Sequence, residues 1–91
     1  MRERIASGRR LIGTMLSEVF FPNISVILKK CGYDFVIIDC EHGPYDCSQV
    51  SLVVAMARAN GISAVVRIPE IRREPIIKYL DMGADGLLVP M

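Results

Sequence analysis

Two carboxylates, the only histidine and a glycine–proline turn stand together in the segment Asp39-Cys40-Glu41-His42-Gly43-Pro44. The segment follows an apolar run, so these polar groups lie where a buried strand is expected to end. A carboxylate beside an imidazole fixes its tautomer and raises its pKa, which makes a general base near neutral pH. His42 is therefore the candidate base and Asp39 its candidate partner. The motif alone leaves open that Asp39 caps the loop and that His42 is a solvated turn residue.

A single arginine, Arg67, stands in the otherwise apolar run 63–68. An unpaired guanidinium is costly to bury, so it must meet an anion. That anion is either a carboxylate of the protein, such as Glu41, or a bound substrate. A cation fixed at the end of a strand also stabilises negative charge that develops on a carbonyl oxygen, as in an enolate. This chemistry suits the cleavage of a carbon–carbon bond.

These side chains need a scaffold, and the sequence alternates short apolar runs with segments of helical period. The runs expected to be strands, buried on both faces, are 11–16, 34–39, 63–68 and 86–89. The segments expected to be helices are 23–31, 47–60 and 74–82. Their expected inward residues are Ile24, Ile27, Leu28 and Cys31, then Val50, Val53, Val54 and Ala57, and finally Ile77 and Leu80. Asp46 or Ser48 is the expected cap of the second helix.

The alternation of strand and helix requires a parallel sheet with right-handed crossovers. An open sheet that binds a dinucleotide would carry a glycine-rich turn after its first strand, where SEVFFPN stands here. A (β/α)₈ barrel has its active site at the carboxyl ends of the strands, where the polar residues gather. We predict an α/β fold, the first half of a (β/α)₈ TIM barrel, in one domain over residues 1–91.

Half a barrel leaves an apolar sheet edge and an unfilled interior. We therefore expect the chain to be partial, or to be completed by another polypeptide. Without more ligands, Asp39 and Glu41 would hold a metal only weakly.

The composition argues against nucleic acid and membrane as partners. The formal net charge is +1 and the basic residues form only short pairs, so nucleic-acid binding is not expected. No apolar stretch is long enough to span a bilayer, and no secretory signal begins the sequence.

Three cysteines without a C-x-x-C spacing suggest free thiols and a cytoplasmic protein. The spacing of Cys40, His42 and Cys47 matches no usual zinc site.

Several segments, in their order and spacing, resemble the HpcH/HpaI aldolases. This family includes 2,4-dihydroxyhept-2-ene-1,7-dioate aldolase and 2-dehydro-3-deoxyglucarate aldolase. The matching segments are IGTMLSE, ILKKCGYDFVIIDCEHGPYD, AVVRIP and IIKYLDMGADGLLVPM. The resemblance implies a class II aldolase that cleaves a 4-hydroxy-2-oxo acid to pyruvate and an aldehyde. In such an enzyme a divalent metal ion (Mg²⁺, Mn²⁺ or Co²⁺) holds pyruvate and stabilises its enolate.

The resemblance also implies residue roles. His42 would accept the hydroxyl proton, Arg67 would bind substrate and stabilise the transition state at the keto oxygen, and Asp81 would raise the basicity of the histidine. A helix that ends at Asp81 leads away from His42 in a barrel, so Asp81 would reach a histidine most easily from a neighbouring subunit. Asp39 is the partner that geometry favours within one chain.

The family's metal ligands, a Glu and an Asp, come from later strands. We therefore expect no metal bound by these 91 residues and no activity from them alone. The resemblance also implies a homo-oligomer, a hexamer, when the barrel is complete. Two alternatives stay open. One is a non-catalytic truncated remnant, and the other is an enzyme of the citrate lyase β or malyl-CoA lyase type, which acts on CoA esters. The D-C-E-H-G-P segment favours the aldolases.

Overall fold

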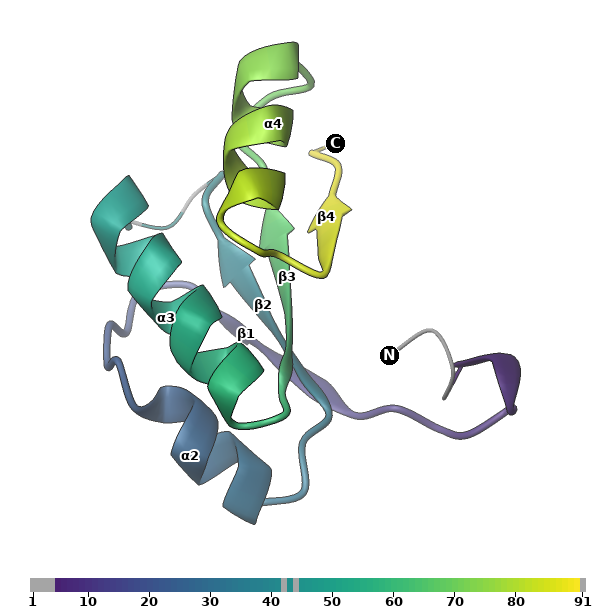
Figure 1. Cartoon of the computed structure of the whole chain (residues 1–91). Helices are drawn as coiled ribbons and strands as arrows, with labels where there is room; N and C mark the ends of the chain where they lie inside the picture. Colours follow the sequence, from purple (N-terminus) through teal and green to yellow (C-terminus); the bar gives the residue numbers. More distant parts are fainter. Residues whose placement is uncertain (1–4, 42, 44, 91) are drawn as a thin grey trace.

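The computed structural model describes residues 5–41, 43 and 45–90 of the chain. Its four strands are parallel and pair in the order of the sequence. The strands are β1 (Gly13–Leu16), β2 (Phe35–Asp39), β3 (Ser63–Arg67) and β4 (Gly86–Leu88), and the helices between them are α2 (Ile24–Lys30), α3 (Cys47–Ala59) and α4 (Arg73–Asp81) (Figure 1). The predicted order of elements is confirmed. The helix α4 begins and ends one residue earlier than predicted, and each of the other elements is slightly shorter than its predicted range.

The three helices lie on one face of the sheet (Figure 1). On that face Val36 and Val66 are completely buried. On the other face Ile37 and Val65 stay partly exposed, because none of the described helices covers them. The prediction that the strands are buried on both faces is therefore wrong for this part of the chain. Helices on one face and strands in sequence order are the arrangement of a (β/α)₈ barrel, whereas a doubly wound sheet carries helices on both faces.

The helix α3 forms as its sequence predicts. Its four predicted inward residues are all buried and pack into the core. Of the two candidate caps, Asp46 is the one that acts: its carboxylate accepts the backbone N–H of Gln49, whose side chain accepts the N–H of Asp46 in return. This capping box starts the helix directly after the turn that follows β2.

The inward face of α2 differs from its prediction. Ile27 and Cys31 are exposed, and Ser25 is buried beside Leu28 instead. Ser25 tolerates burial because its hydroxyl accepts a hydrogen bond from the Asn60 side chain at 3.2 Å. In a helix of two turns, apolar spacing alone does not fix which side faces the core.

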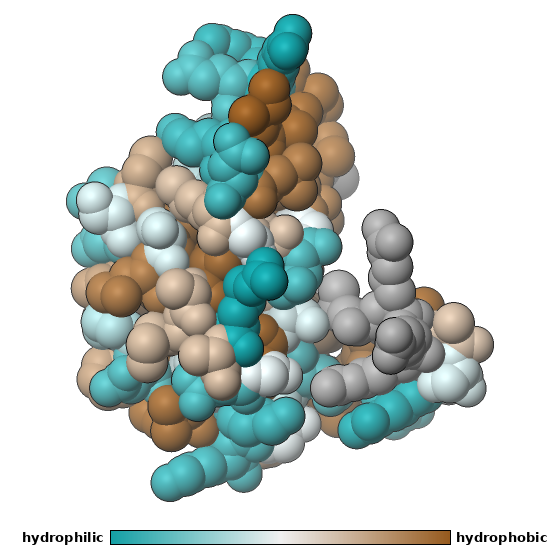
Figure 2. Space-filling model, in the orientation of Figure 1, coloured by the Kyte–Doolittle hydropathy of each residue, from teal (hydrophilic) through white to brown (hydrophobic). Residues whose placement is uncertain are grey.

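The inward face of α4 was also predicted wrongly. Ile77 and Leu80 are 43% and 48% exposed, while Tyr79 is only 6% exposed. Apolar residues occupy both sides of this helix, so its periodicity is ambiguous. In Figure 2 apolar side chains gather on the surface over α4, between charged ones.

None of the helices that the structure describes is long and apolar enough to cross a membrane.

A Gly-x-Asp turn occurs twice between helix and strand, ending at Asp34 and at Asp85. Its glycines have φ of 88° and 100°, a region that favours glycine. The carboxylate of Asp34 accepts the N–H of Ile12 at 3.0 Å, and its own N–H donates to the Ile12 carbonyl at 2.6 Å. Asp85 makes the same pair of bonds with Ala64, at 2.8 and 2.7 Å. These turns fix the amino ends of the strands, so the strand register at the carboxyl ends is fixed as well.

Candidate active site

The register of β2 and β3 places Asp39 directly beside Arg67 at the carboxyl ends of the strands. The guanidinium binds the carboxylate twice: Nε lies 3.0 Å from Oδ1, and Nη2 lies 2.6 Å from Oδ2. Asp39 is 2% exposed. Two parallel charge-assisted bonds hold the plane of the guanidinium in one orientation. The anion that Arg67 requires is thus supplied first by Asp39.

Glu41 is the second carboxylate near Arg67. Its Oε1 lies 3.5 Å from Nε of Arg67, and its backbone N–H donates to Oδ1 of Asp39 at 3.0 Å. The hydrogen bonds that Arg67 donates to Asp39 raise the pKa of the guanidinium, and the negative charge of Glu41 adds to this. The arginine therefore remains a fixed cation at any physiological pH.

Part of this cation is available to a ligand. The bonds to Asp39 and Glu41 use Nε and Nη2 of Arg67, and Nη1 donates to none of the residues that the structure describes. The Arg67 side chain is 25% exposed. Its neighbour in the register, Leu88, is 38% exposed on the open face of the sheet. An oxygen atom of a ligand can therefore meet Nη1 from the open face without breaking the pair with Asp39.

On the helix side of the sheet, Cys40 contacts α4. The Cys40 thiol interacts with the side chain of Tyr79. Burial raises the pKa of the Cys40 thiol and also raises the pKa of Tyr79. A thiol that stays protonated is a poor nucleophile. Cys40 therefore supports the end of β2 rather than reacting.

The other predicted site residues are not brought to this pair. Asp81 is the last residue of α4, is exposed, and makes no hydrogen bond or ion pair with a described residue. The turn after it leads back to the amino end of β4. His42 lies outside the described residues, so its pairing with Asp39 remains a prediction.

Two residues after β2, Gly43 and Tyr45, belong to the site although the sequence pattern does not predict them there. A Cβ atom on Gly43 would collide with the carbonyl oxygen of Asp39, so only glycine fits there. Tyr45 hydrogen-bonds from its hydroxyl to the carbonyl oxygen of Val19 in the loop after β1. The Gly43-Pro44 pair predicts a turn, so the glycine could have been found from the sequence. No local pattern in the sequence predicts the contact of Tyr45 with Val19.

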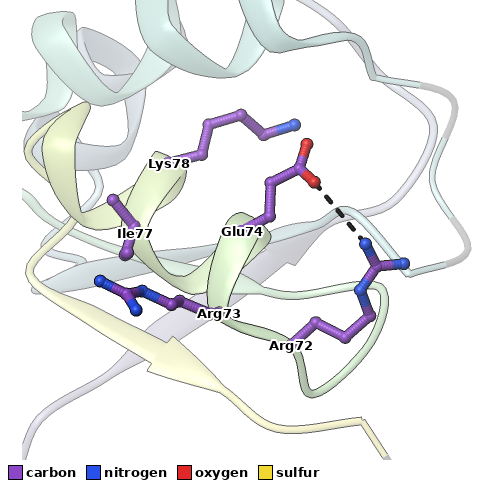
Figure 3. Close-up of a pocket in the computed structure, with 5 residues that line it drawn as sticks. All are labelled: Arg72, Arg73, Glu74, Ile77 and Lys78. Atoms are coloured by element: carbon purple, nitrogen blue, oxygen red, sulfur yellow. Dashed lines mark ion pairs between the residues drawn. The ribbon is translucent and has the colours of Figure 1, made fainter.

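A surface hollow lies apart from the Asp39–Arg67 pair, over the first turns of α4. It is lined by Arg72, Arg73, Glu74, Ile77 and Lys78 (Figure 3). Arg72 is already paired with Glu74, at 3.6 Å. Figure 3 shows Arg73 and Ile77 on one side of the helix and the other three side chains on the opposite side. Because these groups do not converge, the hollow is not a competing candidate for the site.

The described residues also lack the donors of a metal centre. No group of three or more His, Cys, Asp or Glu side chains comes together in the part of the chain that the structure describes. Asp39 and Glu41 both direct oxygens at Arg67 instead.

A family model described as HpcH/HpaI aldolase/citrate lyase matches residues 14–91. The chain belongs to this family. The hydroxypyruvate/pyruvate aldolase of Roseovarius nubinhibens is 36% identical over 90 residues, which are 99% of this chain and 35% of that relative. The 4-hydroxy-2-oxovalerate aldolase of Rhodococcus jostii is 34% identical over 93 residues, again 99% of this chain and 35% of the relative.

Solved structures agree with this assignment. An HpcH/HpaI aldolase from Desulfitobacterium hafniense superposes with a TM-score of 0.91 at 36% identity, over 96% of this chain and 34% of that one. The citrate synthase SbnG has the same TM-score at 32% identity, over 100% of this chain and 37% of its own. The predicted resemblance and α/β fold are confirmed. The chain spans about a third of the length of the relatives it matches.

Proposed function

We propose that the chain is part of an aldolase that cleaves a 4-hydroxy-2-oxo acid to pyruvate and an aldehyde. The observation that carries the proposal is the arginine fixed by Asp39 at the carboxyl edge of the sheet, with Nη1 directed to no described residue. Family membership supports the proposal, because several relatives are named pyruvate or 4-hydroxy-2-oxovalerate aldolases.

Arg67 suits the demand of the bond-breaking step. When the bond between C3 and C4 breaks, its electron pair moves to C3 and on to the keto oxygen, which gains negative charge. A cation already held in place stabilises that charge without reorganising. Arg67 would bind the keto oxygen through Nη1 and keep its two bonds to Asp39.

The proton on the C4 hydroxyl must leave as the aldehyde forms. We assign its removal to His42, on the family resemblance and on its place three residues after Asp39. Both carboxylate oxygens of Asp39 bind Arg67, so the first task of Asp39 is to hold the arginine. Asp81 is exposed at the end of α4 and would support a histidine of a neighbouring subunit. This role requires a homo-oligomer, and the resemblance implies a hexamer.

The resemblance also implies a divalent metal ion in the complete enzyme, where it would act as a Lewis acid on pyruvate. The described carboxylates do not fit such a site, because Asp39 and Glu41 bind Arg67 and no third ligand among the described residues joins them. We therefore assign the metal ligands to residues outside this chain and no catalytic step to the metal here. The 91 residues alone are expected to be inactive.

A second candidate is the formation of citrate by condensation. Its support is the likeness to the citrate synthase SbnG, which is 32% identical with a TM-score of 0.91. The two candidates differ in product, so one preparation tests both. The chain would be extended beyond residue 91 with the later strands of the Roseovarius relative and supplied with Mn²⁺ or Mg²⁺. Pyruvate release from a 4-hydroxy-2-oxo acid supports the aldolase, and citrate formation without pyruvate release supports the synthase.

A further inference from the structure

Tyr45 joins the two loops that meet at the candidate active site. Its hydroxyl donates a hydrogen bond to the carbonyl oxygen of Val19, across a sequence separation of 26 residues. The tyrosine ring packs against the hydrophobic core. Burial raises the pKa of Tyr45, and the negative charge of Asp39 adds to this, so the hydroxyl keeps the proton that it donates.

A second contact links the same two loops. A Cβ atom on Gly43 would lie 3.0 Å from the carbonyl oxygen of Ser17 and 3.1 Å from the ring of Tyr45. Leu16 pairs with Ile38, so Ser17 comes directly beside the end of β2. The turn after β2 is thus packed between the loop after β1 and the tyrosine ring.

What this packing holds in place is the turn that begins at Asp39. Glu41 lies in that turn, and its backbone N–H donates to Oδ1 of Asp39, the oxygen that also accepts from Nε of Arg67. A shift of the turn therefore changes the hydrogen bonds of Asp39 and the orientation of Arg67. Misplacement of about 1 Å is enough to cost an enzyme on the order of 10²-fold in rate.

We propose that Tyr45 is a positioning residue, whose hydroxyl latches the loop of residues 17–22 to the turn after β2 and so fixes Asp39 and Glu41 against Arg67. The catalytic consequence of the latch rests on the proposed aldolase function. The latch itself does not, because it is a contact between two loops.

The test compares Tyr45→Phe with Tyr33→Phe in the extended chain. Both changes remove one hydroxyl, but Tyr33 precedes the amino end of β2 and its hydroxyl bonds no described residue. Backbone amide exchange over residues 17–22, followed by mass spectrometry, reports the latch directly. We expect it to become several-fold faster in Tyr45→Phe and unchanged in Tyr33→Phe. Gly43→Ala adds a methyl group that would collide with the carbonyl oxygens of Asp39 and Ser17, so it should separate the same two loops and also speed the exchange.

Kinetics separate the two proposals. Tyr45→Phe should lower kcat for pyruvate release by about 10-fold and change KM less, because Arg67 remains to bind the substrate. Unchanged exchange in both Tyr45→Phe and Gly43→Ala overturns the latch, even when the extended chain is an active aldolase. Faster exchange in a protein without aldolase activity upholds the latch and overturns the proposed function instead. Faster exchange with unchanged kcat overturns the positioning role.

Discussion

The guanidinium of Arg67 and the carboxylate of Asp39 are joined by two parallel hydrogen bonds, of 3.0 and 2.6 Å, across the ends of β2 and β3. The strand register itself sets the two residues side by side. A cation held by paired strands is more rigid than one carried on a loop, and rigidity is what a transition-state stabiliser needs.

Asp39→Asn should damage the site more than Glu41→Gln. Both changes remove one negative charge and keep the shape of the side chain. Asp39 is the closer partner of Arg67, at 2.6 Å against 3.5 Å, and it is the more buried one. In the extended chain, Asp39→Asn should lower the melting temperature and reduce pyruvate release by about 10²-fold, while Glu41→Gln has a clearly smaller effect on both. Equal losses in the two variants would mean that Glu41 shares the holding of Arg67 equally.

Asp81→Asn tests the role that the family resemblance assigns to this residue. Asp81 is exposed, so its change should leave the free energy of unfolding within about 0.5 kcal/mol of the wild type. If Asp81 raises the basicity of the histidine that we propose as the base, loss of its charge should move the acid limb of the kcat/KM profile to lower pH and lower the plateau.

Mixed oligomers decide whether Asp81 acts between subunits. Co-expression of Asp81→Asn subunits with His42→Ala subunits should restore part of the activity, because some sites then combine an intact histidine with an intact aspartate. A normal pH profile and no recovery in the mixture would remove Asp81 from the mechanism.

Alkaline pH should weaken the fold through Cys40 and Tyr79. Both have a pKa raised above the ordinary values of 9.0 and 10.0. The folded chain then keeps protons that the unfolded chain releases, so the free energy of unfolding falls as pH rises beyond these values. The loss is at most about 1.4 kcal/mol per pH unit for each group. In urea unfolding, Tyr79→Phe should make the fall above pH 10 shallower than in the wild type or in Tyr33→Phe. Parallel curves for all three proteins would contradict this linkage.

Much of the fold follows from local signals in the sequence. In α3 the apolar spacing runs over 13 residues and a capping box marks its start, so both its extent and its inward face are predicted correctly. The shorter helices α2 and α4 carry apolar residues on more than one side. Their inward faces depend on tertiary contacts, such as that of Tyr79 with Cys40, which periodicity does not encode.

The sequence predicts part of the candidate site, namely the strand ends at which its residues lie, but not which residues pair there. The sequence placed Asp39 and Arg67 at the ends of neighbouring strands, because polar groups there interrupt apolar runs. It did not identify Asp39 as the main partner of the arginine, since that depends on the register of strands 28 residues apart. The bond from Tyr45 to Val19 was missed for the same reason, because it joins two loops that only the folded sheet brings together.

The most direct test of the aldolase proposal is pyruvate release from a 4-hydroxy-2-oxo acid, measured with and without Mn²⁺ or Mg²⁺. The extended chain, its His42→Ala and Arg67→Lys variants and the 91-residue chain would be compared. We expect metal-dependent release by the extended chain only, reduced by about 10²-fold or more in both variants, because lysine cannot reproduce the two bonds to Asp39. Metal-dependent release by the 91-residue chain would contradict our assignment of the metal ligands outside it, and full activity of Arg67→Lys would contradict the role given to the Asp39–Arg67 pair.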